Sequence, residues 1–126
     1  MRLRQFVAAI ILSIVFVSAL AQDGGYTEWM KASELSVLMK KMEEDRVFPA
    51  VIDGRVNGAI IQYRTQFIPF LLNLDYFQSK WGMSDSWYKK ADEQLKDAGF
   101  TEYSHTTFTD QSGNTVHQAI WVLIGR

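Results

Sequence analysis

Cysteine is absent from this 126-residue chain, so no disulfide can crosslink its fold and no thiolate can ligate a metal. Lipid attachment through an N-terminal cysteine is excluded for the same reason. Small exported domains often use disulfides to supplement a small hydrophobic core. A cysteine-free domain of this size must instead depend on packing, for which the chain supplies 4 Trp, 5 Tyr and 8 Phe.

Long apolar runs are also scarce, and the one that exists lies at the N-terminus. Arg2 and Arg4 precede the run Phe6 to Val17, and the small residues Ala19 and Ala21 follow it. A run of about a dozen residues is short of the roughly 20 needed for a membrane-spanning helix. The layout instead predicts a cleaved secretory signal peptide over residues 1–21.

A single domain over residues 22–126 is expected to remain after cleavage. Two of the 13 basic residues and none of the 14 acidic ones precede it, which leaves 11 basic against 14 acidic and a net charge of −3. No block of like charge occurs, so the basic footprint of a nucleic-acid-binding protein is missing. We predict a secreted, extracellular protein, or a periplasmic one in a Gram-negative bacterium, with no membrane association after cleavage. No Asn-X-Ser/Thr sequence exists, so no N-glycan is expected.

Two segments show the apolar periodicity of amphipathic helices. The first opens near Ser33, and the second is capped by Ser84 or Asp85 and ends at Gly99. The apolar stripes are Leu35, Leu38, Met39 and Met42 in the first helix, and Tyr88, Ala91, Leu95 and Ala98 in the second.

Four segments are predicted strands. Val47–Ile52 contains Pro49, which places it at a sheet edge or a bulge. Ala59–Ile68 alternates between apolar and polar residues, Phe100–Phe108 is polar, and Val116–Ile124 is apolar enough to be central. Turns are expected at Asp53-Gly54, Asn57-Gly58 and Asp110–Gly113, and Pro69–Lys80 reads as an irregular packed crossover.

Helix–strand–strand thus occurs twice, and the helical stripes coincide on a shift of 53 residues. We predict an α+β fold made of a duplicated αββ unit, with copy one over 29–68, a crossover over 69–82 and copy two over 83–124. Its mainly antiparallel four-stranded sheet should carry two helices on one face. The predicted core comprises Leu35, Leu38, Met42, Ile61, Phe67, Trp87, Tyr88, Leu95, Phe100, Ile120 and Val122.

A family resemblance rests on the second copy. Gly82-Met83-Ser84, Trp87-Tyr88, Gly99-Phe100 and Gln118-Ala119-Ile120-Trp121 occur at spacings similar to those of a bacterial tandem-repeat unit that precedes serine-hydrolase domains such as polyglycine hydrolases. The similarity covers Met83 to Trp121 and is weaker over Trp29 to Phe67. The resemblance implies an accessory or binding module and transfers no catalytic residue.

Two motifs suggest chemistry but lack the necessary partners. Ser86 and Lys89 match the S-x-x-K nucleophile motif of β-lactamase-like enzymes, yet the other elements of that active site are missing. His105 and His117 lie on the two strands of one predicted hairpin, and a one-residue change in register would put them on opposite faces. Two histidines fall short of the three protein ligands usual for catalytic zinc. We therefore predict no catalytic residue, no metal and no cofactor.

A polar sheet face is the remaining candidate site. Tyr63 and Arg64, together with Tyr103, His105 and His117, could contact a ligand if that face is open. Aromatic and amide groups on a rigid surface suit an extracellular protein, peptide or carbohydrate. The chain is therefore expected to be a small non-enzymatic binding or structural module, either a free extracellular protein or a component of an extracellular matrix. The alternatives are a small secreted hydrolase that uses His105 or His117, or an accessory or inhibitor protein of a hydrolase.

Overall fold

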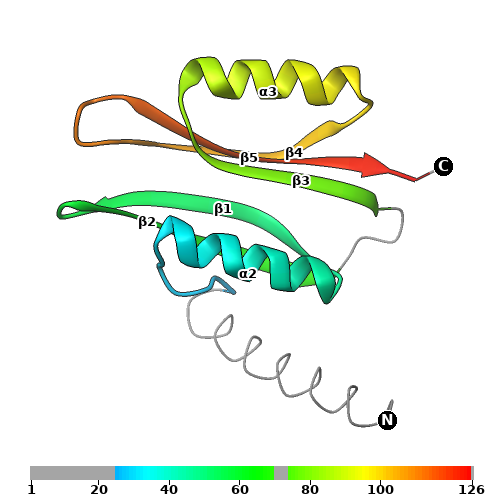
Figure 1. The fold of residues 1–126 in the computed structure, drawn as a ribbon, viewed down its shortest axis with the longest axis horizontal. Coiled ribbons are helices and arrows are strands. Elements are labelled where there is room, and N and C mark those ends of the chain that lie inside the picture. The colour runs from blue at the N-terminus through cyan, green and yellow to red at the C-terminus, as the bar shows by residue number, and fades with distance from the viewer. Residues whose placement is uncertain (1–24, 70–73, 126) are drawn as a thin grey trace, which may run out of the picture.

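The computed structural model describes residues 25–69 and 74–125, so the predicted signal peptide lies outside the described residues. Two helices and five strands follow one another as α2 (Ala32–Glu44), β1 (Val47–Asn57), β2 (Ile60–Pro69), β3 (Leu74–Met83), α3 (Asp85–Asp97), β4 (Thr101–Thr109) and β5 (Thr115–Ile124) (Figure 1). The strands form two antiparallel sheets, β1-β2 and β3-β5-β4. The α+β fold class is thereby confirmed. Within the described ranges, neither helix is long and apolar enough to span a membrane.

The helices begin and end close to the predicted residues. The N-cap of α2 is Lys31, not Ser33, and its backbone N–H donates to the Glu34 carboxylate at 2.9 Å. The N-cap of α3 is Ser84, whose hydroxyl accepts from the Trp87 N–H at 3.2 Å. Gly99 follows α3 at a φ of 95°, and the Phe100 N–H donates back to the Leu95 carbonyl, which is the Schellman form of helix end.

The β1-β2 hairpin contains the predicted bulge at Pro49, where the register shifts between Pro49 and Val51. Gly58 forms the predicted turn with a φ of 65°. The turn expected at Asp53-Gly54 is wrong, because both residues lie inside β1. Gly54 is needed there for space, since a Cβ on it would lie 2.4 Å from the Phe108 ring of β4.

The crossover predicted over Pro69–Lys80 is wrong for its described part, because β3 begins at Leu74 and pairs with β5. Register shifts between Leu74 and Tyr76, and between Lys80 and Met83, break the two-residue alternation that would have identified a strand. The predicted central position of Val116–Ile124 agrees with β5, which lies between β3 and β4.

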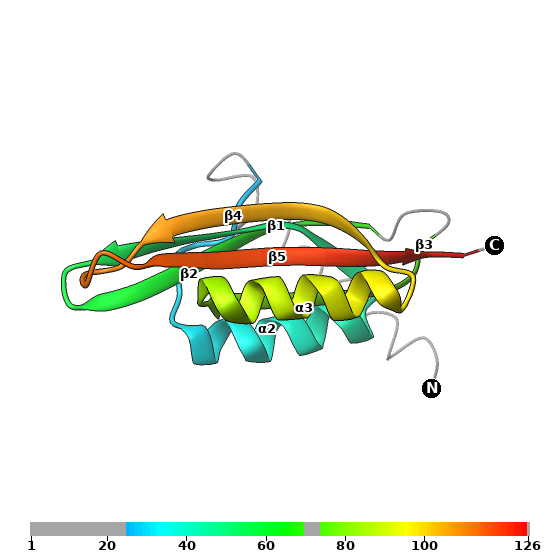
Figure 2. The same ribbon diagram turned by 90° about the horizontal axis from the view of Figure 1, so that it is seen from above.

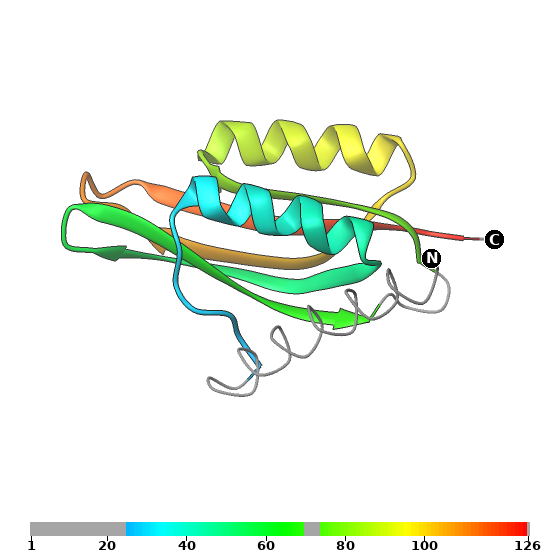
Figure 3. The same cartoon turned by 60° about the horizontal axis from the view of Figure 1, so that its bottom comes forward.

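The two helices do not share one face of a four-stranded sheet, so that part of the prediction is wrong. Alternate residues of β5 face opposite sides. Ala119 and Trp121 pack with α3, whereas Ile120 and Val122 pack with residues of α2 and β1. Figure 1 accordingly shows α3 on one side of the sheet β3-β5-β4 and the β1-β2 hairpin with α2 on the other. Seen from above, helices and strands all follow the long axis (Figure 2), and α2 runs in roughly the same direction as β2 (Figure 3).

Most of the predicted core residues lie inside. Leu35, Met42, Phe67, Ile120 and Val122 are buried, and four more pack against the buried clusters: Leu38, Tyr88, Leu95 and Phe100. Trp87 and Ile61 are exposed at 48% and 39%, so their assignment to the core is wrong. Trp87 lies one residue before the stripe of α3 that faces the sheet, and Ile61 lies beside the hairpin turn.

The two helix–strand–strand units have the same internal geometry. A shift of 53 residues maps α2 onto α3 and maps the bulge after Pro49 onto the bulge after Glu102. β1 maps onto β4 with the same shift of 53, and β2 maps onto β5 with a shift of 54, so Pro49↔Phe67 corresponds to Glu102↔Trp121. Arg46, with a φ of 58°, corresponds to Gly99 at the helix end.

Each unit also has a segment before its helix that pairs with its last strand, which the sequence pattern does not predict. Residues 26–30 pair with β2 through the isolated bridges Tyr26↔Gln66 and Met30↔Tyr63. The same shifts map these onto Ser79↔Ile120 and Met83↔His117 of β3 and β5. We call residues 26–69 unit one and residues 74–124 unit two; the leading segment is a full strand, β3, only in unit two.

Candidate functional site

His105 and His117 lie on the same face of the sheet, the face that α3 covers. His105 pairs with Ala119, and His117 pairs with Thr107, so the histidines are diagonal neighbours on β4 and β5. Their rings meet through His105 Nε2 and His117 Nδ1, which are 2.8 Å apart. The register that the sequence left open therefore brings the two imidazoles together.

Asp85, the first residue of α3, extends this pair into a chain of three groups. Its Oδ1 lies 2.6 Å from His117 Nε2. A carboxylate can only accept, so Nε2 of a neutral His117 carries the proton, and Nδ1 accepts from His105 Nε2. The His117 side chain is 12% exposed and that of Asp85 is 80% exposed. This series of hydrogen bonds therefore connects the largely buried imidazole of His117 to a carboxylate in solvent.

Tyr88 holds both imidazoles from the helix side. Its ring stacks on His105 at 4.2 Å and on His117 at 4.7 Å, with interplanar angles of 13° and 4°. Its hydroxyl donates to Glu102 Oε2 at 2.5 Å. Burial, followed by this carboxylate, raises the pKa of Tyr88 far above its usual range, so the phenol remains a donor. We call Asp85, Tyr88, Glu102, His105 and His117 the histidine cluster.

A second polar contact fixes α3 next to the cluster. The Trp121 indole N–H donates to Asp92 Oδ1 at 2.9 Å, and Lys96 Nζ lies 2.9 Å from the other carboxylate oxygen. Burial alone would raise the pKa of Asp92, but the hydrogen bonds from Trp121 and Lys96 lower it overall. The helix is thus attached to the sheet by these polar contacts as well as by the apolar cluster that contains Ala91 and Trp121.

Unit one provides an internal control for the histidine cluster. The residues equivalent to Tyr88, His105 and His117 are Leu35, Ile52 and Tyr63, all buried in the apolar core. Equivalent to Asp92 and Glu102 are Met39 and Pro49, which are also buried. The architecture therefore accepts an apolar layer at these positions, and the polar layer is particular to unit two.

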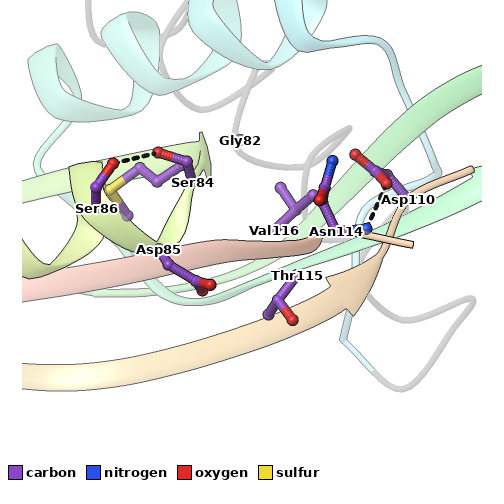
Figure 4. Close-up of a pocket in the computed structure, with 9 residues that line it drawn as sticks. Gly82, Ser84, Asp85, Ser86, Asp110, Asn114, Thr115 and Val116 are labelled. Atoms are coloured by element: carbon purple, nitrogen blue, oxygen red, sulfur yellow. Dashed lines mark hydrogen bonds between the residues drawn. The ribbon is translucent and has the colours of Figure 1, made fainter. Parts of the chain in front are cut away.

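A pocket of about 430 Å³ adjoins Asp85. Figure 4 shows Ser84 and Ser86 at the start of α3 on one side, and Asp110 and Asn114 of the β4-β5 turn on the other. Asp110 Oδ1 accepts from the Ser112 and Asn114 backbone N–H groups at 3.0 and 2.9 Å, which shapes this longer turn. Unit one has a two-residue turn at the equivalent place, so it has no counterpart of the side of the pocket that the β4-β5 turn forms.

The other predicted site residues do not join the histidine cluster. Tyr63 is 4% exposed and belongs to the core, so its placement on an open face with Arg64 is corrected. Adjacent strand residues point to opposite sides, which is why both cannot share one face. Tyr103 is exposed at the bulge of β4, and its ring makes an edge contact with Phe48 at 5.0 Å.

Arg64 belongs to a separate surface on the hairpin of unit one. Its guanidinium lies 4.2 Å from the Tyr26 ring and 4.7 Å from the Trp29 ring, and Arg55 lies 4.2 Å from Trp29 on a similar stack. These cation–π contacts fasten residues 26–30 over the outer face of the hairpin. This packing role explains why the two arginines lie against the aromatic rings, and no ligand is needed to explain the arrangement.

Ser86 and Lys89 show no catalytic geometry. The Ser86 hydroxyl lies 3.3 Å from the Ser84 hydroxyl, and the Lys89 side chain is exposed. The described part of the chain contains no group of three or more His, Cys, Asp or Glu side chains arranged to hold a metal ion. His105 and His117 are the pair of nitrogen ligands that come nearest to one.

The sequence pattern does not identify three members of the cluster as site residues: Asp85, Tyr88 and Glu102. Tyr88 belongs to the predicted apolar stripe of its helix, and the two carboxylates have no distinguishing pattern. Comparison with known proteins adds no further residue: no family model matches the sequence, and neither a curated protein nor a solved structure matches the chain.

Proposed function

We propose that the protein is an exported, non-enzymatic binding module whose ligand site is the pocket beside Asp85 together with the histidine cluster. The observation that carries the proposal is the internal comparison: unit two has polar groups where unit one has core. Polar groups in half-buried positions generally contribute less to stability than packed apolar ones. Their presence in one unit alone therefore favours a role other than folding.

The pocket lining indicates the ligand class. Its polar groups are the hydroxyls of Ser84, Ser86 and Thr115, the carboxylates of Asp85 and Asp110, and the Asn114 amide. No lysine or arginine is among the residues that line it. Hydroxyl and carboxylate oxygens suit a small polar ligand that donates hydrogen bonds, such as a sugar hydroxyl or a peptide amine.

Chemical-shift mapping tests the proposal. Amide spectra of the ¹⁵N-labelled protein would be recorded with EDTA present against a panel of mono- and disaccharides and short peptides. We expect the shifts to concentrate on residues 82–86 and 110–117. Asp85→Asn should reduce the response several-fold, whereas Asp45→Asn, at the exposed end of α2, should leave it unchanged. Shifts confined to the Arg55 and Arg64 surface, or none with any member of the panel, would argue against this site.

A small hydrolase is the second candidate, and the contact between Asp85 and His117 is the observation that favours it. A carboxylate that orients an imidazole is a recurring arrangement in general-base catalysis. The test is turnover of ester, glycoside and phosphoester substrates by wild type and by a His105→Gln/His117→Gln variant. Activity that disappears in the variant would support the hydrolase, and activity that persists would eliminate it.

A further inference from the structure

The two imidazoles of the histidine cluster face each other through one ring nitrogen each. His105 Nε2 and His117 Nδ1 are 2.8 Å apart, and the rings are inclined by 17°. Tyr88 stacks on both rings, so their orientations are already restricted. The two nitrogens are thus held close together, with their rings restricted by Tyr88.

The spacing is close to that of two imidazoles bound to one ion. Metal–nitrogen bonds of about 2.0–2.1 Å at a tetrahedral angle put the two nitrogens about 3.3 Å apart. The pair would therefore separate by roughly half an ångström to admit the ion. The lone pair of His117 Nδ1 accepts the hydrogen bond from His105 Nε2, and it becomes available to the ion when His105 changes tautomer and moves its proton from Nε2 to Nδ1. No proton is gained or lost by the pair in that change.

Asp85 supplies the partner that metal-bound histidines usually have. A ligating imidazole generally donates its other N–H to a carboxylate or carbonyl, which fixes the ring and increases its basicity. Asp85 Oδ1 is 2.6 Å from His117 Nε2, the nitrogen that faces away from His105. Unit one has Ile52 and Tyr63 in place of the two histidines, so the fold does not require the pair.

We propose that His105 and His117 bind one divalent transition-metal ion of the kind that prefers imidazole, such as Zn²⁺, Cu²⁺ or Ni²⁺, with Asp85 as the outer partner of His117. Within residues 25–69 and 74–125 no group of three or more ionisable side chains surrounds a metal position. The remaining coordination positions are therefore taken by water or by a group of a bound ligand. The sequence alone predicts no metal, because it does not fix the register that brings the two histidines together.

Titration with the ion alone tests the proposal. Zn²⁺ and Cu²⁺ would be added to the metal-free protein at pH 7.5 and followed by calorimetry and by melting temperature. We expect one ion per chain and a melting temperature several degrees higher. His105→Gln and His117→Gln should each abolish binding, and Asp85→Asn should weaken it by about 10- to 100-fold.

Lys40→Gln, on the exposed side of α2 and outside the histidine cluster, is the control and should bind as wild type. Circular dichroism establishes that each variant is folded. Absence of binding by the wild type, or equal binding by the histidine variants and the control, would overturn the proposal. Ligand mapping in the presence of EDTA does not involve the ion, so failure of the metal site and failure of the proposed binding function are distinguishable.

Discussion

Gly54→Ala is expected to destabilise the protein by disturbing the contact between the two units. A Cβ at this position would lie 2.4 and 2.5 Å from two carbons of the Phe108 ring and 3.2 Å from the Tyr63 ring. The Phe108 ring must move, and its edge contact with Tyr63, at 6.2 Å between centroids, is lost. Overpacking costs about 1–3 kcal/mol, and an aromatic pair contributes about 0.5–1.5 kcal/mol.

We therefore expect a loss of about 2 kcal/mol in the free energy of unfolding. For a domain of this size, that corresponds to a fall in melting temperature of about 8–16 °C. Urea unfolding followed by tryptophan fluorescence would measure it. Phe108→Ala in the Gly54→Ala background should recover part of the loss relative to the sum of the two single variants. A Gly54→Ala protein within 0.5 kcal/mol of wild type would refute the packing assigned to this contact.

Three further predictions concern the ends and contacts of single elements. Gly99→Ala forces alanine into a left-handed conformation and should lower the free energy of unfolding by about 1 kcal/mol, as measured by urea unfolding. Ala98→Gly is the control, because it leaves the left-handed glycine of the Schellman motif in place. Thr106→Val removes the hydrogen bond from its hydroxyl to the Ile52 carbonyl and should cost about 1 kcal/mol, while Thr107→Val, whose exposed side chain points to the opposite side of the strand, should be nearly neutral. The lowered pKa of Asp92 means that its contribution is present above the unfolded value near pH 4 and is lost as pH falls below it, so Asp92→Asn should flatten the acid limb of the stability profile. Equal acid limbs in wild type and variant would contradict that assignment.

Local chemistry predicted several elements correctly because the signal lay within a few residues. Pro49 cannot donate to a ladder, and the bulge occurs there. Asn57-Gly58 forms the hairpin turn, and Ser84 caps α3. These features depend on backbone conformation, which the residue itself determines.

Strand β3 and the layer order could not be predicted in the same way. Bulges in β3 interrupt the alternation that would have marked Leu74–Met83 as a strand. The position of α2 beneath the sheet β3-β5-β4 depends on long-range packing of Ile120 and Val122, which no local pattern specifies. A polar face containing both Tyr63 and Arg64 was excluded by alternation alone, and the sequence reasoning overlooked this.

The histidine pair illustrates where register becomes decisive. The ladder between β4 and β5 is regular from Ser104↔Ile120 to Thr109↔Thr115, and this register places His105 and His117 on one face. The register depends on the exact length of the β4-β5 turn, which runs from Asp110 to Asn114. The predicted turn Asp110–Gly113 is one residue shorter, and a turn of that length would put the two histidines on opposite faces.

Unit two has a polar site where unit one has core, and this difference between the units can be tested directly. The direct measurement is the free energy of unfolding of the variant Tyr88→Leu/His105→Ile/His117→Tyr, which gives unit two the residues of unit one. If the cluster is present for binding, the variant should be at least as stable as wild type in urea. A loss of more than about 2 kcal/mol would contradict the claim, because it would show that the fold itself depends on the polar layer.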